Sequence, residues 1–117
     1  MDDNIYNALF GARVRYYRER RNLTQKELSE MVGYTVPATI SRIENGNQTI
    51  PLSKLPAFCE ALQVDPYDLL GLREKDQQIT SIAETLGKKN KTADIQQFVD
   101  LYLKLLEGSE DGDGYMD

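Results

Sequence analysis

The sequence has no histidine, no tryptophan and a single cysteine, Cys59, among its 117 residues. The lack of histidine excludes imidazole acid–base catalysis, Ser-His and Cys-His nucleophile pairs, and most zinc sites. One cysteine cannot form an internal disulfide, and we read it as a small buried apolar residue. We also find no glycine-rich phosphate loop and no paired-carboxylate motif. We therefore expect a protein that is not an enzyme and that holds neither a metal nor a cofactor.

Long apolar runs are also missing, so no segment is expected to span a membrane. The first ten residues, MDDNIYNALF, place acids before apolar residues, which is the reverse of a secretory signal. Apolar and charged contents of 40% and 28% are those of an ordinary globular protein. These features, together with the lone cysteine, favour a cytoplasmic protein.

The net charge of −5 argues by itself against binding to nucleic acid. Local potential decides binding, however, and five arginines lie close together near the N-terminus: Arg13, Arg15, Arg18, Arg20 and Arg21. We interpret Arg13, Arg15, Arg20 and Arg21 as a solvated face. The segment 108–117 is acidic and rich in glycine, and we expect it to be a disordered tail.

Helical signals fill residues 5–72, and no β pattern competes with them. Apolar residues at helical spacing predict a first helix that ends near Arg21. Thr24 and Glu27 form a capping-box pattern that opens a second helix, which Gly33 ends. The remaining expected elements are a third helix with Pro37 in its first turn, a fourth capped by Ser53 with Pro56 in its first turn, and a fifth that opens at Asp65-Pro66 and ends at Gly71.

The third helix has two different faces. Val36, Ile40 and Ile43 are expected to face the core. The opposite face carries small and polar residues and one arginine: Ala38, Ser41, Arg42 and Asn45. Such a face can approach another surface closely, and the guanidinium group of Arg42 can donate hydrogen bonds to it.

After a charged linker at 73–78, a sixth helix is expected around Ile79 and Ala83. A polar break follows, and Thr92 is expected to cap a seventh helix over 93–107. Its apolar residues cover an arc of about 200°, twice what packing one side requires. We interpret this breadth as a dimerisation surface, formed by Ile95, Phe98, Val99, Leu101, Tyr102, Leu105 and Leu106. The alternative is that this helix folds back on the five-helix unit within one chain.

Residues 10–71 resemble the lambda-repressor-like (Cro/CI, XRE) helix-turn-helix family. The resemblance rests on FGARVRYYRERRNLTQKEL, ISRIENG and IPLSKLPAFCEALQVDPYDLLG, which follow in the family's order and spacing. The turn GYTVPAT is one residue longer than the commonest family turn and is similar to that of phage and mobile-element repressors of Gram-positive bacteria. The expected fold is all-α: a five-helix DNA-binding domain over 1–72, followed by a C-terminal helical region over 73–107.

The resemblance implies that the second helix of the motif lies in the DNA major groove. Residues implied to face base edges are Pro37, Ala38, Ser41 and Arg42, whereas those implied to hold phosphates are Gln25, Thr39 and Asn45. Arg18 and Glu44 are implied to form a structural ion pair. The alternatives without a DNA contact are that Arg42 is an ordinary solvated arginine and that Gln25 is only a good helix former.

The expected function is a sequence-specific regulator of transcription, a repressor that binds an inverted-repeat operator in double-stranded DNA as a homodimer. The alternative is an antitoxin-like module whose C-terminal helices bind a toxin or an anti-repressor protein, with DNA binding serving autoregulation.

Overall fold

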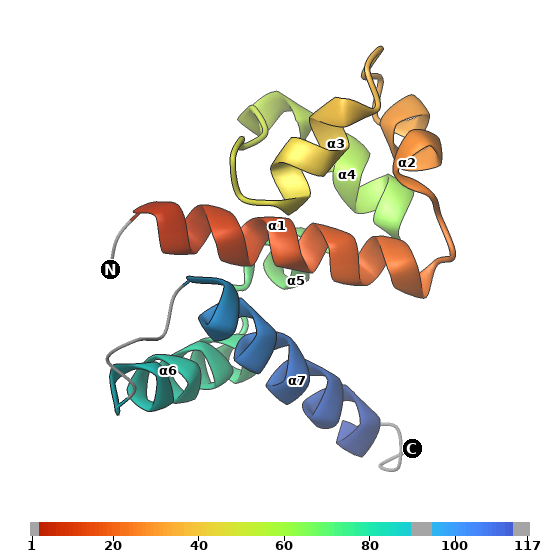
Figure 1. The fold of residues 1–117 in the computed structure, drawn as a ribbon. Coiled ribbons are helices and arrows are strands. Elements are labelled where there is room, and N and C mark those ends of the chain that lie inside the picture. Colours follow the sequence, from red (N-terminus) through yellow and green to blue (C-terminus); the bar gives the residue numbers. More distant parts are fainter. Residues whose placement is uncertain (1–2, 90–94, 114–117) are drawn as a thin grey trace. The chain divides into compact units, whose positions relative to one another are not determined.

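The computed structural model describes residues 3–89 and 95–113, and within these ranges all regular structure is helical (Figure 1). None of the helices in these ranges is long and apolar enough to cross a membrane. The chain divides into two compact units, Met1–Gly71 and Leu72–Asp117. The elements in chain order are α1 (Asp3–Arg20), α2 (Gln25–Met31), α3 (Ala38–Glu44), the 3-10 turn η1 (Leu52–Lys54), α4 (Leu55–Leu62), α5 (Pro66–Leu70), α6 (Glu74–Lys89) and α7 (Ile95–Asp113). The all-α fold expected from the sequence is confirmed.

In the first unit, α2, α3 and α4 gather along one side of the long helix α1 (Figure 1). Gly11 makes the close approach of α1 to α3 possible, because a Cβ at this position would lie 2.1 Å from the carbonyl oxygen of Ile43. The core consists of buried side chains from α1 to α5: Val14, Leu28, Val32, Ile40, Ile43, Phe58, Cys59, Ala61, Leu62 and Leu69. The recognition-helix candidate α3 is therefore fixed on its inner side by the core and by α1.

Two of the expected helix caps are present. The Thr24 hydroxyl accepts from the backbone N–H of Glu27 at 3.0 Å, and the Glu27 carboxylate accepts from the N–H of Thr24 at 2.9 Å, which completes the capping box. The Asp65 carboxylate accepts from the N–H of Asp68 and caps α5, with Pro66 at its first position. Gly71 ends α5 in the left-handed conformation at φ +69°, as expected.

Two other expected starts are wrong. Ser53 does not cap α4; it lies inside η1, and α4 begins after Lys54 without a side-chain cap. A proline at the second position of α4, Pro56, is confirmed. Helix α3 begins at Ala38, so Pro37 occupies the N-cap position and not the first turn. Val36 consequently lies outside the helix and is exposed, not part of the core.

In the second unit, α6 and α7 pack against each other. Ile79 and Ala83 of α6 and Phe98, Val99, Tyr102 and Leu106 of α7 are buried. The expected linker at 73–78 is instead mostly helical, since α6 begins at Glu74. Helix α7 continues to Asp113, beyond the expected end at Glu107, so the start of the expected disordered tail is helical. The expected cap at Thr92 lies outside the described residues.

Candidate nucleic-acid interface

The turn between α2 and α3 is held by hydrogen bonds on its inner side. The backbone N–H of Tyr34 donates to the carbonyl of Ser29 at 2.9 Å, and the Ser29 hydroxyl donates to the carbonyl of Tyr34 at 3.3 Å. The Tyr34 ring packs edge-on against Phe58 with a centroid distance of 6.3 Å. The next three residues, 35–37, are exposed. The turn thus presents a short segment to solvent from a fixed base.

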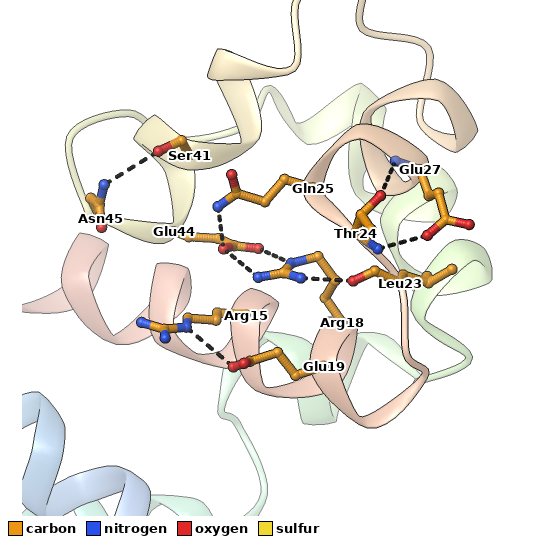
Figure 2. Close-up of polar contacts among 10 residues, drawn as sticks. All are labelled: Arg15, Arg18, Glu19, Leu23, Thr24, Gln25, Glu27, Ser41, Glu44 and Asn45. Atoms are coloured by element: carbon orange, nitrogen blue, oxygen red, sulfur yellow. Dashed lines mark hydrogen bonds and ion pairs between the residues drawn. The ribbon is translucent and has the colours of Figure 1, made fainter.

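Helix α3 turns its small and polar face outward. Ile40 and Ile43 are fully buried, whereas Ala38, Arg42 and Asn45 are exposed and Ser41 is half-buried. Asn45 Nδ2 donates to the hydroxyl of Ser41, one helical turn earlier on this face, at 3.5 Å (Figure 2). The face contains no bulky side chain other than Arg42, so a flat or concave partner surface can approach the backbone of α3 closely.

Arg42 is held by two side chains at the edge of this face. Its Nε donates to Gln48 Oε1 at 2.9 Å, and its Nη2 donates to Thr39 Oγ1 at 3.2 Å. Thr39 is buried, so its hydroxyl serves Arg42 and not the outer surface. Gln48 has no periodic sequence signal, because it lies in the loop after α3, and sequence reasoning missed it; the polar composition of that loop, ENGNQT, is the one signal that could have indicated it. Both partners restrict the guanidinium before any ligand is present, which lowers the entropy lost on binding.

A buried ionic network ties the end of α3 to α1 and α2 (Figure 2). Arg18 donates twice to the Glu44 carboxylate, from Nε to Oε2 at 2.6 Å and from Nη2 to Oε1 at 3.1 Å. The Glu44 side chain is only 3% exposed, and the hydrogen bond with it raises the pKa of Arg18 above its ordinary value, against the opposing effect of burial. Arg18 Nη1 also donates to the carbonyl of Leu23 at 2.7 Å. The residues implied to pair are thus together, and they connect three helical segments.

Gln25 belongs to the same network. Its Nε2 donates to Glu44 Oε1 at 2.9 Å, while its amide oxygen points away from Glu44 (Figure 2). The side chain lies at the first position of α2 and is half-buried. Gln25 therefore links the start of α2 to the end of α3, a contact that sequence reasoning did not anticipate.

Comparison with known proteins gives three consistent matches to this chain. The family model described as Helix-turn-helix matches residues 14–69. An HTH-type transcriptional regulator of Bacillus subtilis, YozG, which is itself uncharacterized, is 41% identical over 58 residues, covering 49% of this chain and 68% of the relative. The chain belongs to the helix-turn-helix family of transcriptional regulators. The crystal structure of the restriction-modification controller protein C.AhdI from Aeromonas hydrophila has a TM-score of 0.50 and 26% identity, with 53% of this chain and 92% of that chain covered.

Arginines of α1, and Arg21 directly after it, form hydrogen bonds within the first unit of this DNA-binding regulator. Arg13 is buried, and its guanidinium donates to the carbonyls of Leu69 at 2.8 Å and Leu70 at 3.2 Å, at the end of α5. Arg21 Nη1 donates to the carbonyl of Ala61 at the end of α4. Cations at helix C-termini satisfy free carbonyls and favour the helix dipole. Interpreting Arg13 as part of a solvated face was therefore wrong.

Cys59 lies in the core of the first unit, as expected. Burial, and to a smaller extent the nearby Asp65 carboxylate, raises the pKa of its thiol. Since the thiolate is the reactive form, this environment disfavours reaction at sulfur.

The residues expected to form a dimer surface differ in their exposure along α7. Phe98, Val99, Tyr102 and Leu106 are buried, and Leu101 and Leu105 are half-buried, while Ile95 is exposed. The Tyr102 hydroxyl donates to the carboxylate of Asp76 on α6, at 2.7 Å from Oδ1 and 2.9 Å from Oδ2. Part of the wide apolar arc is thus used inside one chain, by packing on α6.

Proposed function

We propose that this transcriptional regulator is a cytoplasmic repressor that binds an inverted-repeat operator as a homodimer and reads each half-site with the outer face of α3. The observation that carries the proposal is the single arginine on that face, oriented by Gln48 and Thr39 on a helix that the Arg18–Glu44 network fixes. Arg42 would donate twice to guanine O6 and N7, a contact that contributes about 1–3 kcal/mol of discrimination.

The neighbouring residues fit the same docking. Pro37, Ala38 and Ser41 would face base edges close to Arg42, and the Asn45 amide would reach the DNA backbone from the end of the helix. Gln25 Nε2 carries two N–H groups and donates one of them to Glu44, so the second would be the group that holds a phosphate. Thr39 would act through Arg42 rather than on a phosphate, because its hydroxyl is buried in that contact.

Dimerisation would use the part of α7 that α6 leaves available. Leu101 and Leu105 lie one turn apart and are half-buried, and Ile95 is exposed. A protomer with one recognition helix contacts one half-site, and a two-fold symmetric dimer contacts both half-sites of an operator, which lie about one helical turn apart. The resemblance of the long turn to phage and mobile-element repressors of Gram-positive bacteria adds a proposed origin for the regulator.

A second function is favoured by the exposed Ile82 on α6 and Ile95 on α7. Apolar side chains on these helices suit an antitoxin-like protein whose second unit binds a toxin or an anti-repressor. Co-purification of a stoichiometric protein partner with the second unit would support this alternative.

Selection of bound duplexes from a random DNA pool tests the reading function. Native protein, Arg42→Ala and the control Arg15→Ala, on the exposed side of α1, are compared at physiological salt. We expect native protein and Arg15→Ala to enrich the same inverted repeat, and Arg42→Ala to lose a guanine preference in each half-site. Absence of any enriched sequence with native protein would overturn the proposal.

The dimer is tested separately by sedimentation of Leu105→Glu against Lys104→Glu, which lies next to it on the exposed face of α7. We expect Leu105→Glu to be monomeric with unchanged helix content and Lys104→Glu to remain dimeric. The structure also changes the best truncation: removing residues 92–117 would strip α7 from the buried face of α6, whereas a cut after Gly71 separates the two compact units. We expect residues 1–71 to fold as a monomer that binds the operator weakly; a dimer with normal affinity would contradict the assignment.

A further inference from the structure

Val36 is an apolar residue left exposed beside the recognition helix. Its side chain is 51% exposed, although helical spacing places it in register with the buried Ile40 and Ile43. The cause is the late start of α3 at Ala38, which leaves Val36 in the turn and off the buried stripe. Single exposed apolar residues are common, and what distinguishes Val36 is its place directly before the helix that we propose reads the bases.

The backbone around Val36 is fixed on both sides. The carbonyl of Val36 accepts from the N–H of Thr39 at 3.0 Å, and the carbonyl of Pro37 accepts from the N–H of Ile40 at 3.1 Å. Pro37 has φ −59°, the angle that its ring imposes. Two residues earlier, Tyr34 is bonded to Ser29 through both its N–H and its carbonyl. A β-branched side chain also has few χ1 rotamers, so Val36 is presented in a restricted orientation.

The chemistry of this segment selects what it contacts. Val36, Pro37 and Ala38 are consecutive, exposed and apolar, and their side chains have no donor or acceptor. Among the groups that bases present in the major groove, the C5-methyl of thymine is the apolar one. The N-terminal end of a recognition helix is the part that approaches base edges.

We propose that Val36 determines specificity by packing against the C5-methyl of a thymine in each operator half-site. The inference rests on the proposed reading function and adds a residue outside the helix to it. Val36 lies two residues before Ala38, and Ala38 is one helical turn, about 6 Å, from Arg42 along α3. Base pairs rise about 3.4 Å. The thymine therefore lies within about three base pairs of the guanine that Arg42 reads.

The test replaces thymines of the selected operator by deoxyuridine, one position at a time in both half-sites. This exchange removes only the methyl group and keeps the base-pairing and acceptor pattern. Native protein should lose about fourfold in affinity for each methyl removed at one position near the guanine, or roughly tenfold or more for both half-sites. Val36→Ala should bind the thymine operator correspondingly less tightly and should no longer distinguish thymine from deoxyuridine there.

Two control variants make the result specific. Leu52→Ala truncates another exposed apolar residue, in η1, and should keep the full thymine preference. Ala38→Ser tests the neighbour, and thymine discrimination that survives in Val36→Ala but disappears in Ala38→Ser would overturn the assignment to Val36. Unfolding curves of each variant verify that the fold is retained.

The outcomes separate the two proposals. An enriched operator that contains no deoxyuridine-sensitive thymine, or one whose sensitivity is unchanged in Val36→Ala, overturns the role of Val36 and leaves the reading function intact. Failure to enrich any operator overturns both.

Discussion

Different kinds of contact stabilise the interior of each of the two units. In the first, charged side chains reach across the sequence to fix helix ends: Arg18 to Glu44, Arg13 to the end of α5 and Arg21 to the end of α4. Lys54 does the same for α2, donating to the carbonyl of Val32 at 2.8 Å. In the second, two amphipathic helices pack through apolar side chains, with the Tyr102–Asp76 bond at their buried interface.

This difference fits the roles that we propose for the two units. A helix that reads base edges must be held within a fraction of an ångström, and hydrogen bonds with fixed geometry restrict orientation more tightly than apolar packing does. A surface for self-association or partner binding depends mainly on apolar area, for which a helical hairpin suffices. Contacts removed from the first unit should therefore affect the position of α3, and contacts removed from the second should not.

The largest effect is expected for Arg18→Ala. The Glu44 carboxylate would stay buried with Gln25 as its remaining neutral donor, which costs about 3–5 kcal/mol of unfolding free energy. Urea unfolding followed by hydrogen exchange measures the loss and assigns it to the first unit. Arg15→Ala removes the exposed i,i+4 pair with Glu19 and should cost less than about 0.5 kcal/mol.

Replacing both partners sharpens this result. Arg18→Met with Glu44→Met removes the two charges together, so most of the lost stability should return. Operator affinity should stay reduced in the double variant, since the direction of α3 no longer depends on a bidentate bond. Recovery of both stability and affinity would show that the ion pair does not orient the helix.

The second prediction concerns glycine, which the two units use differently. Alanine at Gly11 would place its Cβ 2.1 Å from the Ile43 carbonyl oxygen and 2.8 Å from that of Glu44, so α1 and α3 must separate. Overpacking of this kind costs about 1–3 kcal/mol. Gly108 of α7 has no neighbour within 4 Å of such a Cβ, and Gly108→Ala should leave stability equal or raise it by up to about 1 kcal/mol. Thermal unfolding of the two variants makes the comparison, and equal effects would contradict it.

Sequence reasoning succeeded where the signal is local. The Thr24–Glu27 box, the Asp65-Pro66 start and the terminal Gly71 each depend on residues within four positions, and each is found as expected. The pairs Arg13–Leu69 and Arg21–Ala61 span 56 and 40 positions and have no periodic signature. Such pairs are set by how the helices pack, which a single sequence does not specify.

The errors near the interface have a related cause. Helical spacing does not reveal where a helix begins when the first residues lack a capping side chain, and α3 starts after Pro37 with none. The later start leaves Val36 exposed instead of buried, and Thr39, which was implied to contact a phosphate, is itself buried. The charged segment 73–78 contains no apolar residue, and its composition therefore predicts a linker. Charged residues also favour helix where one face, here with buried Asp76, packs on a partner.

The third prediction addresses the hairpin. Tyr102→Phe removes the hydroxyl that donates to the buried Asp76 carboxylate, and we expect a loss of about 1–2 kcal/mol confined to the second unit. Tyr6→Phe removes a hydroxyl from an exposed ring of α1 and should be neutral. Hydrogen exchange of α6 and α7 amides measures the change. Equal protection in native protein and Tyr102→Phe would mean that apolar packing alone holds the hairpin.

The smallest effect is expected at the exposed capping box, and it depends on pH. The hydrogen bond from the Thr24 backbone, with a further contribution from its hydroxyl, lowers the pKa of Glu27 below its ordinary value of 4.5. Because the folded pKa is the lower one, the carboxylate stabilises the fold above the unfolded pKa, and this contribution disappears as the pH falls through the folded pKa. Glu27→Gln keeps an acceptor for the Thr24 N–H but not the charge, so native protein should be slightly more stable at pH 7 and the difference should vanish in acid. Glu30→Gln removes the same charge later in α2 without touching the cap, and so reports the general effect of net charge. Unfolding midpoints of the three proteins between pH 7 and pH 3 give the comparison; a Glu27→Gln difference that is constant with pH, or equal to that of Glu30→Gln, would mean that the charge of Glu27 has no particular role in the cap.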